Sequence, residues 1–198
     1  GGSALRDFAV WSALSEIHGT DWRQWPEELR DPRSTAAEEF AAAQAERVEF
    51  FEWLQWTAQQ QLSAAQTAAE EAGMGIGVLA DLAVGVGKTS AETWLMGDVY
   101  APGITVGAPP DQYNQGGQDW GQPPWNPLKL EELEYEPFRT MVRAALNRVG
   151  GLRIDHIIGL FRLWWVPDGL GPSAGTYVRY NHEALIGILA LEAYRAQA

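Results

Sequence analysis

Hydrophobic residues near the N-terminus follow the spacing of an amphipathic helix. They recur every three to four positions from Leu5 to Ile17, and Gly19 follows as a stop signal. We therefore expect a helix over residues 4–17. The three residues before it, Gly-Gly-Ser at 1–3, are typical of a cloning remnant.

A second helical pattern covers residues 34–71, which contain neither glycine nor proline. Thr35 and Glu38 have the spacing of a capping box, and Gly73 is placed as a C-terminal stop. The stretch Val48–Trp56 is apolar around most of the helix circumference, so we expect it to be buried. One helix of this length is above the average, so a break or two packed helices is the alternative.

From Gly75 on, short apolar runs alternate with helical patterns. The run Gly75–Val84 is bounded by glycines and almost entirely apolar, which is typical of a strand buried on both faces in a parallel sheet. The elements expected after it are a loop over 85–127, a helix over 130–149, a strand over 152–156, a helix from Ile158 to before Pro167, and a helix over 183–196. This order predicts a helical subdomain over 4–73 and a parallel α/β region over 74–198.

Charge and composition argue against several classes of protein. The 198 residues carry 14 Lys and Arg against 26 Asp and Glu, a net charge of −12. Nucleic acids and anionic lipid heads attract basic surfaces, so we expect neither nucleic-acid binding nor membrane anchoring. Cysteine is absent and only three histidines are present, so we expect no metal site. No apolar run reaches about 18 residues and no signal peptide is visible, which predicts a cytoplasmic protein.

Tryptophan is unusually frequent, with ten in the chain. Large aromatic rings fill hydrophobic cores, and flat rings also stack on the apolar faces of sugars. Composition does not decide between these two uses.

The segment Gly85–Ser90, Gly-Val-Gly-Lys-Thr-Ser, imitates a phosphate-binding loop. That pattern requires a further glycine five residues before Gly87, and Leu82 occupies the position. Without this glycine the backbone N–H groups cannot surround a phosphate in the usual way. We therefore expect no nucleotide site here.

The motif Arg153-Ile154-Asp155-His156 closes an apolar strand. In parallel α/β folds and barrels, catalytic groups lie at the carboxyl ends of strands. Alternation places Arg153 and Asp155 on one face, where the guanidinium favours the ionised carboxylate that a nucleophile requires. The alternative is a structural Arg–Asp pair, with His156 capping the next helix.

A long loop stiffened by prolines is predicted over Gly107–Trp125. It carries Tyr113, Trp120 and Trp125, with amide and acid side chains between them. These rings are suited to platforms beneath a sugar. The alternative is a surface loop whose rings fold onto the body of the protein.

Together, these motifs resemble glycoside hydrolase family 77, the 4-α-glucanotransferases or amylomaltases. The resemblance rests on the loop Gly107–Pro127 followed by Gly-Leu-Arg-Ile-Asp-His at 151–156. It extends over nearly the whole chain and includes Leu54–Trp56, Ile76–Val86, Ala101–Gly103 and Leu160–Pro167.

The resemblance implies an incomplete part of a (β/α)₈ TIM barrel, about strands 3 and 4, with a helix-rich insertion subdomain and a long substrate loop over 85–127. It implies transfer of α-1,4-glucan segments between maltooligosaccharides by a retaining double displacement, without a cofactor. Asp155 matches the nucleophile that forms a covalent glucosyl-enzyme. Arg153 matches the arginine that holds this carboxylate, and His156 matches a histidine that contacts the sugar.

Further residues match family positions outside this motif. Gln118 and Trp120 match a sugar-contacting Gln-x-Trp, and Asp111 matches the aspartate of a Pro-Pro-Asp. Tyr113 keeps one of the two rings that many members have after that aspartate. Asp81 matches the acidic residue that ends the previous barrel strand, where an architectural role is implied.

The family's acid/base glutamate, its third carboxylate and its other barrel strands have no counterpart in this sequence. The chain therefore resembles a fragment of an enzyme of roughly 500–700 residues. The alternative function is that of a catalytically incomplete fragment that acts only as a structural or weak glucan-binding module. Barrel strands without neighbours expose apolar edges, so we also expect the isolated chain to self-associate.

Overall fold

A computed structural model describes residues 2–198, which form two compact units. The first unit comprises the chain up to Gln61 together with Gly87–Gly97. The second comprises Leu62–Val86 and Asp98–Ala198. Residue 73, where the sequence suggested a boundary, lies inside the second unit.

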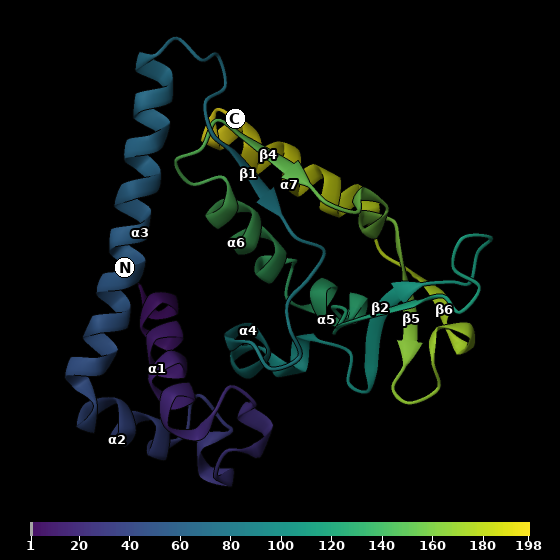
Figure 1. Cartoon of the computed structure of the whole chain (residues 1–198), viewed down its shortest axis with the longest axis horizontal. Helices are drawn as coiled ribbons and strands as arrows, with labels where there is room; N and C mark the ends of the chain where they lie inside the picture. Colours follow the sequence, from purple (N-terminus) through teal and green to yellow (C-terminus); the bar gives the residue numbers. More distant parts are fainter. Residues whose placement is uncertain (1) are drawn as a thin grey trace. The chain divides into compact units, whose positions relative to one another are not determined.

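The first unit is helical (Figure 1). Its helices are α1 (Ser3–His18), α2 (Thr35–Ala43), the N-terminal part of α3 (Ala45–Glu71) and α4 (Ala91–Leu95). Short 3₁₀ turns over Trp22–Gln24 and Glu27–Leu29 connect α1 to α2. The helix predicted over 4–17 is confirmed as α1. Of the residues interpreted as a cloning remnant, Gly1 lies outside the described residues, and Gly2 and Ser3 are the N-cap and first residue of α1.

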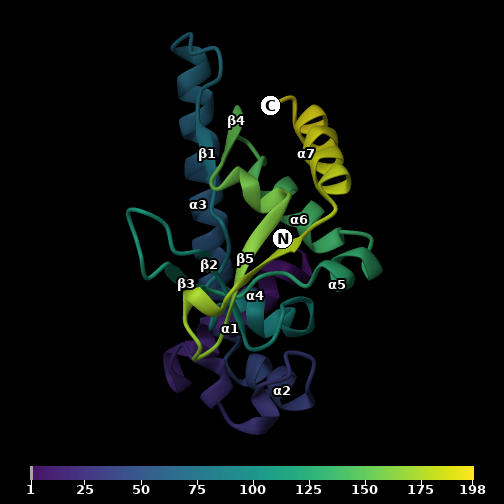
Figure 2. The same cartoon turned by 90° about the vertical axis from the view of Figure 1, so that its right-hand side faces the viewer.

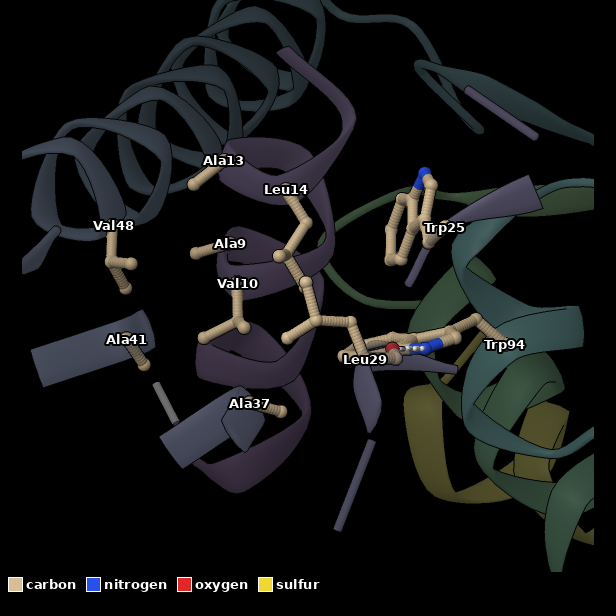
Figure 3. Close-up of a cluster of buried hydrophobic side chains, with 10 residues drawn as sticks. All are labelled: Ala9, Val10, Ala13, Leu14, Trp25, Leu29, Ala37, Ala41, Val48 and Trp94. Carbon is tan, nitrogen blue, oxygen red and sulfur yellow. Dashed lines mark hydrogen bonds between the residues drawn. The ribbon is translucent and has the colours of Figure 1, made fainter. Parts of the chain in front are cut away.

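A hydrophobic core joins α1 to the segments around it (Figure 3). Leu14, Trp25 and Trp94 belong to this buried cluster, and the two indole rings meet edge-on with centroids 5.8 Å apart. Both indole N–H groups donate to backbone carbonyls, Trp25 to Gly19 at 2.7 Å and Trp94 to Leu29 at 3.0 Å. Two large rings are therefore buried here without leaving a donor unpaired.

The long helical pattern is divided in two, as the alternative allowed. Gln44 leaves the helical conformation and separates α2 from α3. The N-cap of α2 is Ser34, whose hydroxyl accepts from the N–H of Ala37 at 3.1 Å. The cap predicted at Thr35 is therefore wrong by one residue.

The predicted burial at the centre of this pattern is wrong for most of its aromatic residues. Val48 is buried in the core of the first unit, but Trp53 and Trp56 are 52% and 55% exposed. Phe50 and Leu54 are also exposed. Because α3 meets the core along one face, a stretch that is apolar all round leaves its other face uncovered in the described chain.

The second unit contains strands and helices in the order β1 (Leu79–Leu82), β2 (Ile104–Ala108), β3 (Gln118–Gln122), α5 (Pro127–Glu132), α6 (Glu136–Ala145), β4 (Gly151–Ile154), β5 (Arg162–Pro167), β6 (Thr176–Arg179) and α7 (His182–Ala196). The C-terminal part of α3 also belongs to it. An α/β fold is thus confirmed, as are the strand before His156 and the last helix. Within residues 2–198, no helix is both long and apolar enough to cross a membrane.

Three parts of the predicted α/β pattern are wrong. The region 85–127 is not a loop throughout, because it contains α4, β2 and β3. The helix predicted over 130–149 is divided, since Tyr135 has a φ of 59° and Pro137 lacks the N–H that a continuous helix needs. The residues before Pro167 form β5 rather than a helix, because this aromatic and branched run pairs with β2 on one side and β6 on the other.

β1 and β4 lie side by side as parallel strands (Figures 1 and 2). Asp81 lies opposite Arg153 in this pair, and α6 comes between the two strands in the chain. The predicted parallel pairing is therefore confirmed. The predicted burial of the first strand on both faces is wrong, because Leu79 is exposed and β4 is the one strand paired with β1 among the described residues.

The start of β1 is held by a buried glutamine of α3. The Gln66 side-chain carbonyl accepts from the N–H of Val78 at 2.7 Å, and its amide donates to the Ile76 carbonyl at 3.2 Å. Gly150 lies so close to this turn that a Cβ there would be 1.5 Å from the Ile76 oxygen. These contacts set where β1 and β4 begin to pair.

The remaining strands form an antiparallel sheet in the order β3-β2-β5-β6, with β6 labelled in Figure 1 and β3 in Figure 2. The register between β2 and β3 shifts between Val106 and Gly107. A Cβ on Gly107 would lie 1.9 Å from the backbone oxygen of Gln118, so only glycine permits this approach. The close contact fixes the position of β3 and of the side chains it carries.

α6 and α7 are joined by an ion-pair cluster around a buried carboxylate. Glu192 is 2% exposed and accepts from Arg143 at 3.0 and 3.1 Å and from Arg195 at 2.7 Å. The hydrogen bonds from Arg143 hold the pKa of Glu192 below its usual value. The charge of this carboxylate is thus compensated from both helices.

Candidate functional site

Three charged side chains meet where β1 and β4 end. The Arg153 guanidinium donates to Asp81 on the neighbouring strand, and it also contacts Asp155 Oδ1 at 3.5 Å. The N–H of Asp155 donates to the Leu82 carbonyl at 3.0 Å, which continues the parallel ladder beyond β4. Arg153 therefore lies between two carboxylates, and the Asp155 side chain is 54% exposed.

His156 follows in a left-handed backbone conformation, with a φ of 50°. This conformation is uncommon for residues other than glycine, and it turns the chain sharply after Asp155. His156 precedes a 3₁₀ turn over Ile157–Leu160, but its side chain makes no capping hydrogen bond. The capping role considered for His156 is therefore wrong, whereas an Arg–Asp pair is present as both interpretations required.

Strand β3 brings the side chains of Gln118 and Trp120 close to His156. The indole ring of Trp120 meets the His156 ring edge-on, with centroids 5.0 Å apart and an interplanar angle of 88°. The Trp120 indole N–H donates to Gln118 Oε1 at 2.8 Å. A pocket of about 370 Å³ lies here, lined by Val84, Gln118, Trp120, Gln122, Asp155 and His156.

Asp111 and Tyr113 do not line this pocket. Asp111 Oδ1 accepts from the N–H groups of Tyr113 and Asn114, both at 2.7 Å, and so closes its own turn. The Tyr113 ring is 90% exposed. Trp125 lies elsewhere, with its ring edge-on to Phe138, as expected if loop rings fold onto the body.

The chain is similar to known proteins over its whole length. The model of glycoside hydrolase family 77, described as 4-α-glucanotransferase, matches residues 1–198. The chain belongs to this family. The resemblance inferred from the sequence motifs is thereby confirmed.

Relatives within family 77 are similar along the chain. A 4-α-glucanotransferase of Mycobacterium tuberculosis is 56% identical over 197 residues, which cover 100% of this chain and 27% of the relative. One from Haemophilus influenzae is 40% identical, covering 91% of this chain and 26% of the relative. The crystal structure of amylomaltase from Corynebacterium glutamicum superposes with a TM-score of 0.83 at 45% identity, covering 100% of this chain and 26% of that one. The chain thus spans about a quarter of the length of these family 77 proteins.

Two pocket residues of this family 77 chain were not predicted from the sequence. Val84 is apolar and follows β1, so its type carries no signal of a binding role. Gln122 is the last residue of β3. The only sequence signal for a binding role was its side-chain type, which it shares with Gln118 four residues earlier. Nowhere in the described chain do three or more His, Asp or Glu side chains gather as metal ligands would.

Burial lowers the pKa of His156 below its usual 6.5, and the negative charge of Asp155 opposes this shift without cancelling it. We expect an NMR titration to place the His156 pKa below 6.5, so the ring is neutral at pH 7. Between the folded-state pKa and 6.5 the unfolded chain binds more protons, so the free energy of unfolding decreases as the pH falls through this window. A titration midpoint at or above 6.5 would contradict the burial of the ring.

Proposed function

We propose that the complete protein is a 4-α-glucanotransferase that transfers α-1,4-glucan segments from one maltooligosaccharide to the 4-hydroxyl of another. The observation that carries this proposal is the pocket in which Asp155, His156, Gln118 and Trp120 meet, in a chain that belongs to family 77. The pocket combines a carboxylate, an aromatic ring and amide groups. These are the group types that a sugar needs for attack, stacking and hydrogen bonding.

The proposed reaction is a retaining double displacement. An oxygen of Asp155 forms a bond to the anomeric carbon while the glycosidic C–O bond breaks, and the leaving oxygen takes a proton from an acid outside these 198 residues. The 4-hydroxyl of the acceptor then attacks the glucosyl-aspartate, loses its proton to the same group and releases Asp155. Water is the disfavoured acceptor because the bound sugar excludes it from the intermediate.

The other predicted residues take supporting roles in this proposal. Arg153 orients the Asp155 carboxylate, and Asp81 holds Arg153 from the neighbouring strand. The neutral His156 ring and the Gln118–Trp120 pair contact the sugar. Asp111 shapes the turn that presents Tyr113, an exposed ring suited to a more distant glucose unit. Carboxylates supply both the nucleophile and the proton transfers, so the proposed chemistry requires no metal or cofactor.

We also propose that β1 and β4 are strands 3 and 4 of a TIM barrel. They are parallel and adjacent, helix α6 leads into β4, and their charged residues lie at the carboxyl ends, where barrel active sites are found. The unpaired outer edges of this two-stranded sheet support self-association of the isolated chain. Taken alone, the 198-residue chain is proposed to be catalytically inactive and to bind glucan weakly at most. A cytoplasmic location remains the prediction from the sequence.

The product profile from maltotriose tests this function. The complete enzyme should yield glucose together with maltooligosaccharides longer than maltotriose, because each transfer lengthens one chain and shortens another. The 198-residue chain should yield neither product. If the complete enzyme releases only shorter products, it is a hydrolase, and the proposed transfer is wrong.

A further inference from the structure

One polar atom of a side chain that lines the pocket has no partner. Gln122 Oε1 is buried and accepts no hydrogen bond from any described residue. It is turned toward Gly85, where a Cβ would lie 3.3 Å from it. Gln122 is one of the residues that line the pocket, together with Asp155 and His156. A buried acceptor without a partner costs free energy. A ligand hydroxyl that donates to this oxygen therefore gains more binding free energy than one that donates to an exposed acceptor, which water already satisfies.

The side-chain amide of Gln118, by contrast, already has a hydrogen-bond partner. Gln118 Oε1 already accepts from the Trp120 indole N–H, so its acceptor is engaged before any ligand arrives. Gln122 therefore offers an open carboxamide, with one acceptor and two donors. The hydroxyl groups of a sugar can donate and accept at once, which matches such a group.

We infer that Gln122 is a substrate-positioning residue whose carboxamide binds a hydroxyl of the glucan next to the glucosyl unit held by Asp155. This inference rests on the proposed function. Rotation of the terminal amide brings Oε1 from its position beside Gly85 into the pocket, where the sugar hydroxyl donates to it. The bond exists in both the ground state and the transition state, so Gln122 contributes mainly to binding rather than to the rate of the chemical step.

Kinetics of the complete enzyme with maltotriose test this role. Gln122→Met keeps the length of the side chain and removes its hydrogen bonds, so KM should rise about three- to tenfold while kcat stays within about twofold. The matched control is Gln60→Met, the same change at an exposed residue of α3 outside the pocket, which should leave both values unchanged.

Maltotriose analogues that each lack one hydroxyl group distinguish substrate binding by Gln122 from a purely structural role. A structural role would not make the change in KM depend on which hydroxyl is missing. One deoxy position should raise KM for the wild type but not for Gln122→Met, because the variant has already lost that bond. If circular dichroism shows that Gln122→Met does not fold, Gln122→Asn replaces it. This variant keeps the amide on a side chain one carbon shorter, so KM should rise less, and the same deoxy analogue should be affected.

Two results distinguish a failure of this inference from a failure of the proposed function. If the wild type transfers glucan but KM and the deoxy pattern are the same in the folded Gln122 variants, this inference is overturned and the proposed function stands. If the wild-type enzyme transfers nothing, the proposed function itself fails.

Discussion

Replacing Asp155 by Asn in the complete enzyme is expected to lower the rate of transfer from maltotriose by about 10⁴-fold or more. The amide has nearly the same size as the carboxylate but cannot form the glucosyl ester on which the double displacement depends. Arg153 would keep its contact with Asp81, so the local structure should be preserved. Product analysis at long incubation times measures the residual rate.

Binding and a control variant complete this test. Asp155→Asn should still bind maltotriose, because the remaining pocket side chains are unchanged, and calorimetry measures this directly. Asp98→Asn makes the same chemical change at an exposed residue outside the pocket and should retain full activity. Transfer by Asp155→Asn at more than about 1% of the wild-type rate would rule out Asp155 as the nucleophile.

Trp25→Ala is expected to reduce the free energy of unfolding of the first unit by about 3–5 kcal/mol. Trp25 is 1% exposed, and its removal leaves a cavity beside Trp94 and withdraws the hydrogen bond to Gly19. Urea unfolding followed by far-ultraviolet circular dichroism measures the loss. The midpoint of urea unfolding should move to a clearly lower concentration, because this cost is a large part of a typical domain's stability.

The matched control is Trp53→Ala, the same substitution at a ring that is 52% exposed. It should change the free energy of unfolding by no more than about 1 kcal/mol, since little buried surface is lost. Equal losses for the two variants would mean that the exposed face of α3 is covered in solution, for example by a second copy of the chain.

Some elements were predictable because local signals agreed with the packing. α1 and α7 have a regular apolar spacing, and the strand before His156 is a short apolar run after two glycines. β5 was missed because a run such as Leu163–Val166 is compatible with either a buried helix or a strand. Its pairing with β2 and β6, contributed by residues far away in the chain, decides for the strand.

The candidate site was predictable to a similar extent. The motif around Asp155 predicted a site by residue type and by position at the end of a strand, both of which are properties of the local sequence. Asp111 and Tyr113 lie in the same predicted loop as Trp120, yet they are outside the pocket, and Asp111 closes a turn of its own. Distance along the chain therefore did not indicate which loop residues approach Asp155.

The sequence by itself determined the family, the α/β class and the strand end that carries Arg153 and Asp155, because these depend on residue order and short-range spacing. Only the tertiary structure decided that Trp120 meets His156, that Gln122 joins the same pocket, and that one face of α3 is uncovered. Each of these depends on which segments distant in sequence pack together. That packing is set by the summed contacts of the whole unit rather than by any local pattern.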